Sequence, residues 1–266
     1  MNILALDTST QWAAVALARA DEEARVATME PGPRHGRNLL PAIRELLQRA
    51  GLAPKELDAV AVGLGPGSYT GLRIGLTAAK ALTYATGGTL LAFESLEVIA
   101  RNAPTTARRV AVIVDAQRGD LYAEDFERSE PEAPLKRRGM VRIETATDWA
   151  ARQDPEVPVL CPDFDRIARL IPTPANLGTP EQGRPQGLRL LEIAREALEA
   201  GQRADPWFLE PIYLRRSAAE ENWEARRQVS SSVVDHTTIP LRIALNQEKR
   251  DVVWPKTDED GPTKAP

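Results

Sequence analysis

The chain has little of the chemistry on which disulfide-stapled folds and zinc sites depend. It contains one cysteine, Cys161, in 266 residues, so it can form no internal disulfide and no cysteine-rich zinc cage. Its two histidines, His35 and His236, are too far apart in sequence to form a zinc-binding pair at i and i+4. Cys161 lies in the apolar run 157–162 and is predicted to be a buried apolar residue.

The chain also lacks a long apolar run and an excess of basic charge. No stretch reaches membrane-spanning length, and the Met1-Asn-Ile-Leu start is unlike a secretory leader, so we expect a cytoplasmic protein with no membrane partner. Lysine and arginine number 34 against 38 aspartates and glutamates, which gives a net charge of −4. With no overall basic field to attract RNA, a partner would have to hold any RNA that the protein serves.

The most distinctive segment present is a glycine-rich loop between an apolar strand and a helix. Glycines stand at 63, 65 and 67 after the apolar run 57–62, and a helix is expected over 70–86 with Ser68 or Thr70 as its cap. Such a turn aims backbone amides at a ligand, often a phosphate. The Walker lysine is absent and the dinucleotide pattern lacks its third glycine, so the two common nucleotide signatures do not apply.

The order of the expected elements predicts an α/β fold of two related lobes. Strands at 3–7, 12–18 and 24–29, helix 37–50, strand 57–62, helix 70–86, strand 89–93 and helix 95–102 give the order β-β-β-α-β-α-β-α. At Val110 the pattern begins again, with strands at 110–114, 121–126, 138–143 and 157–161 and helices at 146–152, 164–171 and 188–200. We therefore predict two ribonuclease-H-like lobes of the actin and sugar-kinase type with mixed sheets. They span 1–107 and 108–223, the second is degenerate, and a disordered tail follows at 224–266.

Five motifs, in order and at compatible spacing, resemble those of one protein family. They are Ile3–Thr10, His35 with Leu39-Leu40-Pro41, the Gly-Pro-Gly-Ser-Tyr-Thr-Gly-Leu-Arg-Ile-Gly run 65–75, Asp115–Tyr122 and Pro211–Arg215. Over about residues 1–223 the chain resembles the TsaB family, the non-catalytic dimerisation subunit of the bacterial system that forms threonylcarbamoyladenosine in tRNA.

This resemblance implies a scaffold that pairs with a catalytic threonylcarbamoyltransferase sibling (TsaD-like), with a P-loop ATPase (TsaE-like) as a third member. The complex would modify the adenosine beside the anticodon and would use ATP, whereas this chain would need no cofactor of its own. The tRNA would be bound through the complex rather than directly. An isolated chain could also pair with itself through the surface that it offers to the sibling.

The catalytic sibling carries a His-x-Glu-Gly-His metal motif on the helix that follows the next strand. Counted from Gly65, its two histidine positions fall on Ser95 and Ile99, and its glutamate falls on Glu97. Isoleucine cannot bind a metal and serine alone is a poor ligand. We therefore predict no metal site and no catalytic residue, and we expect Glu97 to be an ordinary acid on the helix surface.

Two aspartates, Asp7 and Asp115, end the corresponding first strands of the two lobes, where a two-lobed phosphotransferase would bind metal and phosphate. Neither is followed by the glycine that usually lets the backbone wrap a phosphate. In the first interpretation the two aspartates cap their own turns. In the second they retain a vestigial or partner-shared nucleotide contact. The weak nucleotide-contact candidates are Asp7, Gly65, Gly67 and Ser68.

Two helices carry the predicted partner interface. Small residues four apart line one face of helix 70–86, and large apolar residues line one face of helix 37–50. They can pack on the chain's own sheet, contact a second subunit, or do both with opposite faces. The predicted interface residues are Leu39, Leu40, Ile43, Leu47, Gly71, Gly75 and Ala79.

The alternative function is a stand-alone ATP-dependent phosphotransferase or metallo-hydrolase on the same actin-like fold. The missing glycines after Asp7 and Asp115 and the missing histidines weigh against it. We expect the chain not to be an enzyme by itself.

Overall fold

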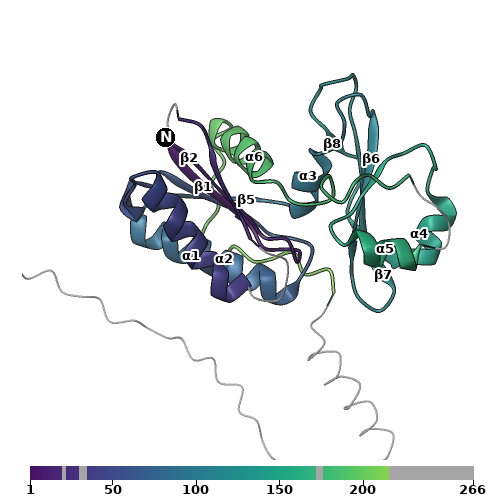
Figure 1. Ribbon diagram of the computed structural model, residues 1–266, viewed down its shortest axis with the longest axis horizontal. Coiled ribbons are helices and arrows are strands. Elements are labelled where there is room, and N and C mark those ends of the chain that lie inside the picture. Colours follow the sequence, from purple (N-terminus) through teal and green to yellow (C-terminus); the bar gives the residue numbers. More distant parts are fainter. Residues whose placement is uncertain (20–21, 30–34, 172–175, 216–266) are drawn as a thin grey trace, which may run out of the picture. The chain divides into compact units, whose positions relative to one another are not determined.

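The computed structural model describes residues 1–19, 22–29, 35–171 and 176–215 (Figure 1). The predicted tail, 224–266, lies outside the described residues. Within the described ranges, no helix combines the length and the apolar character that crossing a bilayer requires.

Five strands form the first sheet, in the order β3-β2-β1-β4-β5. Their bounds are β1 Asn2–Asp7, β2 Ala14–Arg19, β3 Arg25–Thr28, β4 Ala59–Gly63 and β5 Thr89–Phe93. The first three strands pair antiparallel as a meander, whereas β4 pairs parallel to β1 and β5 parallel to β4. The parallel pairs require helical crossovers, and these bring the glycine loop after β4 next to the turn after β1.

Alternate residues of each strand face opposite sides of this sheet. Leu4 and Leu6 lie in a core that includes side chains of α1 (His35–Arg49) and α2 (Tyr69–Thr86), with the short 3₁₀ helix η1 (Pro54–Glu56) between α1 and β4. Ile3 and Ala5 point the other way, into a core shared with α6 (Gly187–Glu199) (Figure 1). The strand residues that face α6 are mostly alanines, which lets this helix approach the sheet closely.

The second sheet is built around a hairpin of β6 (Arg109–Asp115) and β7 (Asp120–Glu127). Its order is β10-β6-β7-β8, and β9 also pairs with β7; the outer strands are β8 Lys136–Arg137, β9 Arg142–Thr145 and β10 Val159–Leu160. One face packs on α3 (Ser95–Ala100), and the other packs on α4 (Ala146–Arg152) and α5 (Phe164–Leu170).

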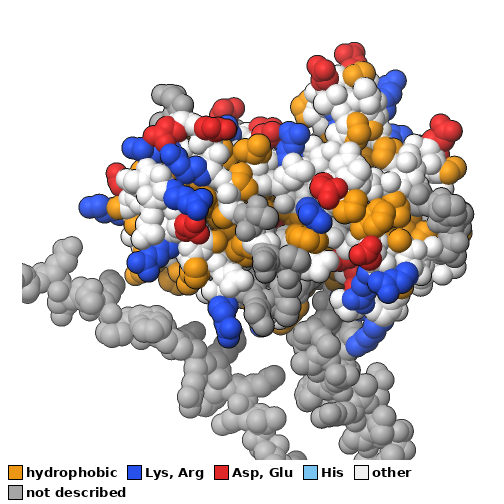
Figure 2. Space-filling model, viewed as in Figure 1, with side chains coloured by type: hydrophobic (Ala, Val, Ile, Leu, Met, Phe, Trp, Pro, Cys, Tyr) orange, Lys and Arg blue, Asp and Glu red, His pale blue; other side chains and the backbone are white. Residues whose placement is uncertain are grey.

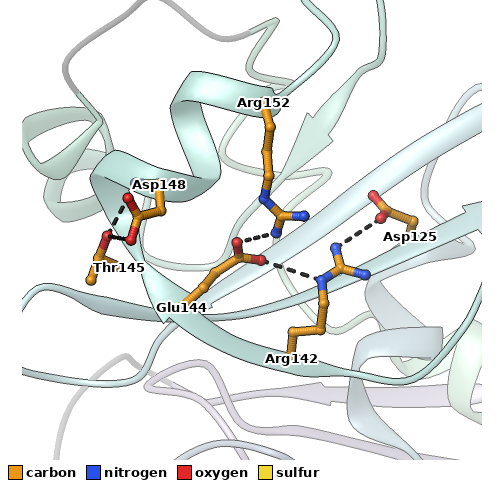
Figure 3. A network of polar contacts seen from close by, with 6 residues as sticks. All are labelled: Asp125, Arg142, Glu144, Thr145, Asp148 and Arg152. Carbon is orange, nitrogen blue, oxygen red and sulfur yellow. Dashed lines mark hydrogen bonds and ion pairs between the residues drawn. The ribbon is translucent and has the colours of Figure 1, made fainter.

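A chain of ion pairs holds β9 in place (Figure 3). Arg142 donates to Asp125 of β7 over 2.9 Å and lies 3.4 Å from Glu144, which also pairs with Arg152 of α4. The hydroxyl of Thr145 accepts the backbone N–H of Asp148 at 3.0 Å and so caps α4. Because the pairs share members, they tie this short strand both to β7 and to the helix that follows.

Cys161 is buried, as predicted, in the core between the second sheet and α5. Burial, with a smaller contribution from the charge of Asp163, raises the pKa of its thiol to about 12. The side chain therefore stays a neutral thiol at physiological pH and serves as a small apolar residue.

The predicted order β-β-β-α-β-α-β-α and the mixed sheets of two related lobes are confirmed. The prediction of one continuous strand at 138–143 is wrong. Two short strands, β8 and β9, stand in its place, because Gly139 between them adopts a left-handed φ of +107°. The division at 107/108 stays a prediction. Packing crosses it in both directions, since α3 covers the second sheet and α6 covers the first.

Candidate functional site

The glycine loop after β4 lies directly against the turn after β1. A Cβ on Gly67 would come within 3.0 Å of the carbonyl of Ser9, and one on Gly71 would do the same to the carbonyl of Thr8. The Thr8 hydroxyl donates to the Gly71 carbonyl at 2.7 Å. The glycines are therefore required for this close approach, and the turn occupies the space above the loop.

The amides that could cradle a phosphate are bound within the chain. Ser68 N donates to the Ser9 carbonyl at 2.6 Å, and Gly65 N donates to the Ser95 hydroxyl at 3.0 Å. Gly71 N donates to the Ser68 hydroxyl at 3.2 Å, so Ser68, one of the two expected caps, caps α2. The loop has the backbone of an anion site, but these three donors are already paired.

Asp7 is completely buried and caps the turn after β1. Its Oδ1 accepts the Ser9 backbone N–H at 2.8 Å and the Ser9 hydroxyl at 2.6 Å. Its Oδ2 has no hydrogen-bond partner among the described residues, and a side chain at Gly63 would collide with it. The aspartate is thus enclosed by its own turn and by β4.

Asp115 caps the matching turn of the second sheet. Its Oδ1 accepts the Gln117 backbone N–H at 2.8 Å, and its Oδ2 lies 2.9 Å from Arg166 Nε. The turn-capping reading is therefore confirmed for both aspartates. The other reading, a partner-shared nucleotide contact, stays a prediction.

Side chains from the first turn also reach the loop between β10 and α5. Gln11 Nε2 donates to Asp163 at 2.7 Å, and the Trp12 indole donates to the Pro162 carbonyl at 2.9 Å. Burial, followed by the charge of nearby Asp115, raises the pKa of Asp163. Polar groups at this junction are therefore engaged with each other.

The positions that match the sibling's metal motif have structural roles. Ser95 is buried and exchanges hydrogen bonds with Gly65, and Ile99 lies in the core under the second sheet. Glu97 accepts from Arg101 at 2.7 Å, and Arg101 also pairs with Glu196 of α6 at 2.6 Å. Across the described part of the chain, no three histidine, cysteine or acidic side chains gather as metal ligands would.

The structure places six of the seven predicted interface residues inside the chain's own fold. Leu39, Ile43, Leu47 and Ala79 belong to the core between α1, α2 and the first sheet. Gly71 and Gly75 face Thr8. Leu40 alone among the seven is exposed, at 58%. The apolar face of α1 thus covers the sheet, and a partner could contact only the opposite side.

The outward side of α2 also carries exposed residues, and these are not among the seven predicted interface residues. On α2 the exposed positions include Arg73, Thr77, Ala81 and Tyr84, three to four apart and hence on one face. Tyr84 is 83% exposed. The signal was present in the sequence, because these residues lie opposite the small-residue line of α2.

The closing motif 211–215 links the two sheets. Ile212 N donates to the carbonyl of Leu64, which follows β4, at 2.8 Å. The Tyr213 ring lies 4.9 Å from that of Tyr69, and Arg73 Nε donates to the Tyr213 hydroxyl at 3.0 Å. We call residues 211–215 the strap.

Arg215 provides the strap's second anchor. Its guanidinium donates to the Ala116 carbonyl at 2.8 Å and to Asp120 at 3.0 Å, both in the β6–β7 hairpin. The strap therefore fixes the hairpin tip relative to the start of α2.

Charged side chains of both signs are interspersed on the face shown in Figure 2, so no single-sign field covers it. This distribution agrees with the net charge of −4. The structure thus offers a closed glycine loop, two capped aspartates and a set of exposed residues on two helices. We call these residues the exposed strip; they are Leu40 of α1 and Arg73, Thr77, Ala81 and Tyr84 of α2.

Known proteins resemble this chain over most of its length. It is 31% identical over 230 residues to the tRNA threonylcarbamoyladenosine biosynthesis protein TsaB of Bacillus subtilis, covering 84% of this chain and 98% of the relative. It is 28% identical to the protein of the same name from Escherichia coli, covering 82% and 96%. A family model described as "TsaD: tRNA N6-adenosine threonylcarbamoyltransferase" matches residues 30–134.

A solved structure also matches. It is the crystal structure of an uncharacterized protein with similarity to peptidase YeaZ from Pseudomonas aeruginosa, with a TM-score of 0.69 and 28% identity. The match covers 80% of this chain and 99% of that one.

Proposed function

The chain belongs to the TsaB family of tRNA threonylcarbamoyladenosine biosynthesis proteins, and from this we propose that it is the non-catalytic scaffold of that modification system. In this proposal it pairs with a threonylcarbamoyltransferase of the TsaD kind, which modifies the adenosine beside the anticodon. A P-loop ATPase of the TsaE kind is the third member, and that complex consumes the ATP. The chain itself holds no cofactor, works in the cytoplasm where tRNA is modified, and meets tRNA through the complex.

The observation that carries the proposal is that the groups on which an enzyme of this fold would rely are paired within the chain or, like Asp7 Oδ2, buried in it. The amides of Gly65, Ser68 and Gly71 are paired, and Asp7 and Asp115 cap their own turns. An enzyme needs polar groups that are free to meet a substrate. This arrangement therefore favours a scaffold over a stand-alone phosphotransferase or hydrolase.

The exposed strip on α1 and α2 is the surface we assign to the partner. Leu40 and Tyr84 supply its large exposed apolar side chains. The guanidinium carbon of Arg73 lies 4.1 Å from the centroid of the Tyr69 ring, in a cation–π contact. Tyrosine and arginine are enriched among the residues that dominate protein interfaces. The family model of the TsaD type spans residues 30–134, which include both helices. A partner with related helices could pair face to face, as in a two-fold dimer.

The test is partner binding by single substitutions. Leu40→Asp and Tyr84→Asp place a charge in the proposed contact without touching the core, so each should weaken binding to the TsaD-type transferase of the same organism by about 100-fold. Isothermal titration calorimetry measures the affinity, and circular dichroism checks the fold.

Met140→Asp is the matched control, because Met140 is 85% exposed but lies between β8 and β9. It should leave the affinity unchanged. If the two strip variants bind as tightly as this control, the partner uses another surface and the scaffold proposal loses its structural support.

A further inference from the structure

A pocket of about 330 Å³ opens between α6 and the strands β2 and β3, away from the partner strip. Such a volume lies at the lower end of the range for small-molecule sites. Its walls are mostly apolar and include Val26, Ala27, Met29 and Leu188. Trp12 forms a further wall and is held in place because its indole donates to the Pro162 carbonyl at 2.9 Å.

The pocket is also lined by Arg184, which forms no ion pair with any residue that the structure describes. The guanidinium carbon of Arg184 lies 3.8 Å from the Trp12 ring centroid, in a cation–π contact. Its Nε is buried and has no hydrogen-bond partner within the described ranges. By contrast, Arg101 and Arg215, which are also partly buried, each pair with a carboxylate.

An unpaired buried donor is costly, and an arginine fork fits a carboxylate or phosphate. Glu181 also borders the pocket, but it is exposed and forms no ion pair with Arg184 in the described part of the chain. The pocket thus places an apolar wall beside an arginine that forms no ion pair within the described ranges.

We propose that this pocket is a binding site for a small organic anion that joins an acidic group to an apolar or aromatic body. The acidic group would accept hydrogen bonds from Arg184, and the apolar body would lie against Val26 and Leu188. The site is separate from the glycine loop and from the partner strip, so it is independent of the proposed scaffold role.

The experiment compares two probes of nearly equal shape, 1-naphthaleneacetate and the uncharged 1-naphthaleneacetamide. Each is titrated into the full chain while the tryptophan indole signals are followed by two-dimensional NMR, with the Trp12 signal assigned through Trp12→Phe. We expect the acetate to shift the Trp12 signal saturably and to bind about tenfold more tightly than the amide, as a charge-assisted hydrogen bond implies.

Three variants locate the site. Arg184→Gln should reduce the affinity for the acetate to that for the amide. Val26→Trp should fill the pocket and abolish binding of both, because Val26 lines the pocket, is 43% exposed and lies on the face of the sheet that α6 covers. Arg189→Gln, a charge removal on the nearby helix α6 outside the pocket lining, should change neither affinity. Equal affinity for the two probes, an unmoved Trp12 signal, or full acetate binding by folded Arg184→Gln would each overturn the proposal.

Discussion

The glycines of α2 cannot be replaced by larger residues without a collision, because other atoms of the chain lie directly opposite them. A Cβ on Gly75 would come within 3.0 Å of the Thr8 hydroxyl, which is itself bonded to the Gly71 carbonyl. Any side chain there must push the β1–β2 turn away from the helix. We therefore expect Gly75→Ala to lower the free energy of unfolding by about 1–3 kcal/mol, as overpacking does, measured by urea denaturation.

Gly36→Ala is the matched control on α1. A Cβ there would lie 3.3 Å from Ile74 Cδ1, the end of a flexible side chain, so the neighbour can move. The variant should be neutral or gain up to about 1 kcal/mol from helix propensity. Equal destabilisation by both substitutions would mean that the Thr8 contact is not the cause. Because Gly75 supports the fold, a loss of partner binding after its replacement by a larger residue would not locate the interface.

Glu124 is a buried acid whose ionisation the fold opposes. Its carboxylate is 1% exposed and lacks a hydrogen bond within the described residues, while Arg137, 3.4 Å away, also pairs with Glu94. Burial is the main cause that raises its pKa to about 7; Arg137 and Arg142 lower it, and the charges of Glu94 and Glu97 raise it.

The native state therefore keeps the Glu124 proton at pH values where the unfolded chain has released it. The contribution of Glu124 to stability should be fully present below the ordinary pKa of 4.5 and should be lost as the pH rises through about 7. The shift corresponds to about 3 kcal/mol at full ionisation. Glu124→Gln should remove this contribution to the slope of unfolding free energy between pH 5 and pH 8. Glu127→Gln, at an exposed position of the same strand, should keep it. An unchanged slope in Glu124→Gln would place the titration elsewhere.

Removal of the strap should lower the stability of the protein, because the strap contacts residues next to both sheets. Truncation after Glu210 deletes the Ile212, Tyr213 and Arg215 contacts, whereas truncation after Trp223 keeps them. If these contacts sum to about 2–3 kcal/mol, the shorter protein should melt about 5 °C or more below the longer one. The longer one should match the full chain in melting temperature and in partner binding. Equal melting temperatures for the two truncations would remove the strap's stabilising role.

Much of the fold follows from local patterns in the sequence. The alternating apolar strands, the Ser68 cap and the Gly87 stop of α2 each depend on neighbouring residues, and the expected helix 70–86 begins within one residue of the observed one. The side that a helix presents to the sheet depends on distant residues. The apolar face of α1 covers β2 and β3, so Leu39 and Ile43 are buried while Leu40 is exposed. For the same reason no local pattern revealed that α3 packs on the second sheet or that the strap joins the two.

The engaged loop and the two capped aspartates leave the exposed strip on α1 and α2 as the surface on which the proposed function depends. If isolated chains pair with themselves through this strip, self-association and partner binding must compete, because one face cannot hold two occupants. Sedimentation velocity should then show added transferase converting a homodimer into a one-to-one heterodimer. Leu40→Asp should weaken both equilibria by similar factors, since Leu40 would lie in both contacts. A homodimer that survives Leu40→Asp while the heterodimer is lost would show two separate surfaces. In that case the two-fold pairing of related helices would be the wrong description of the heterodimer.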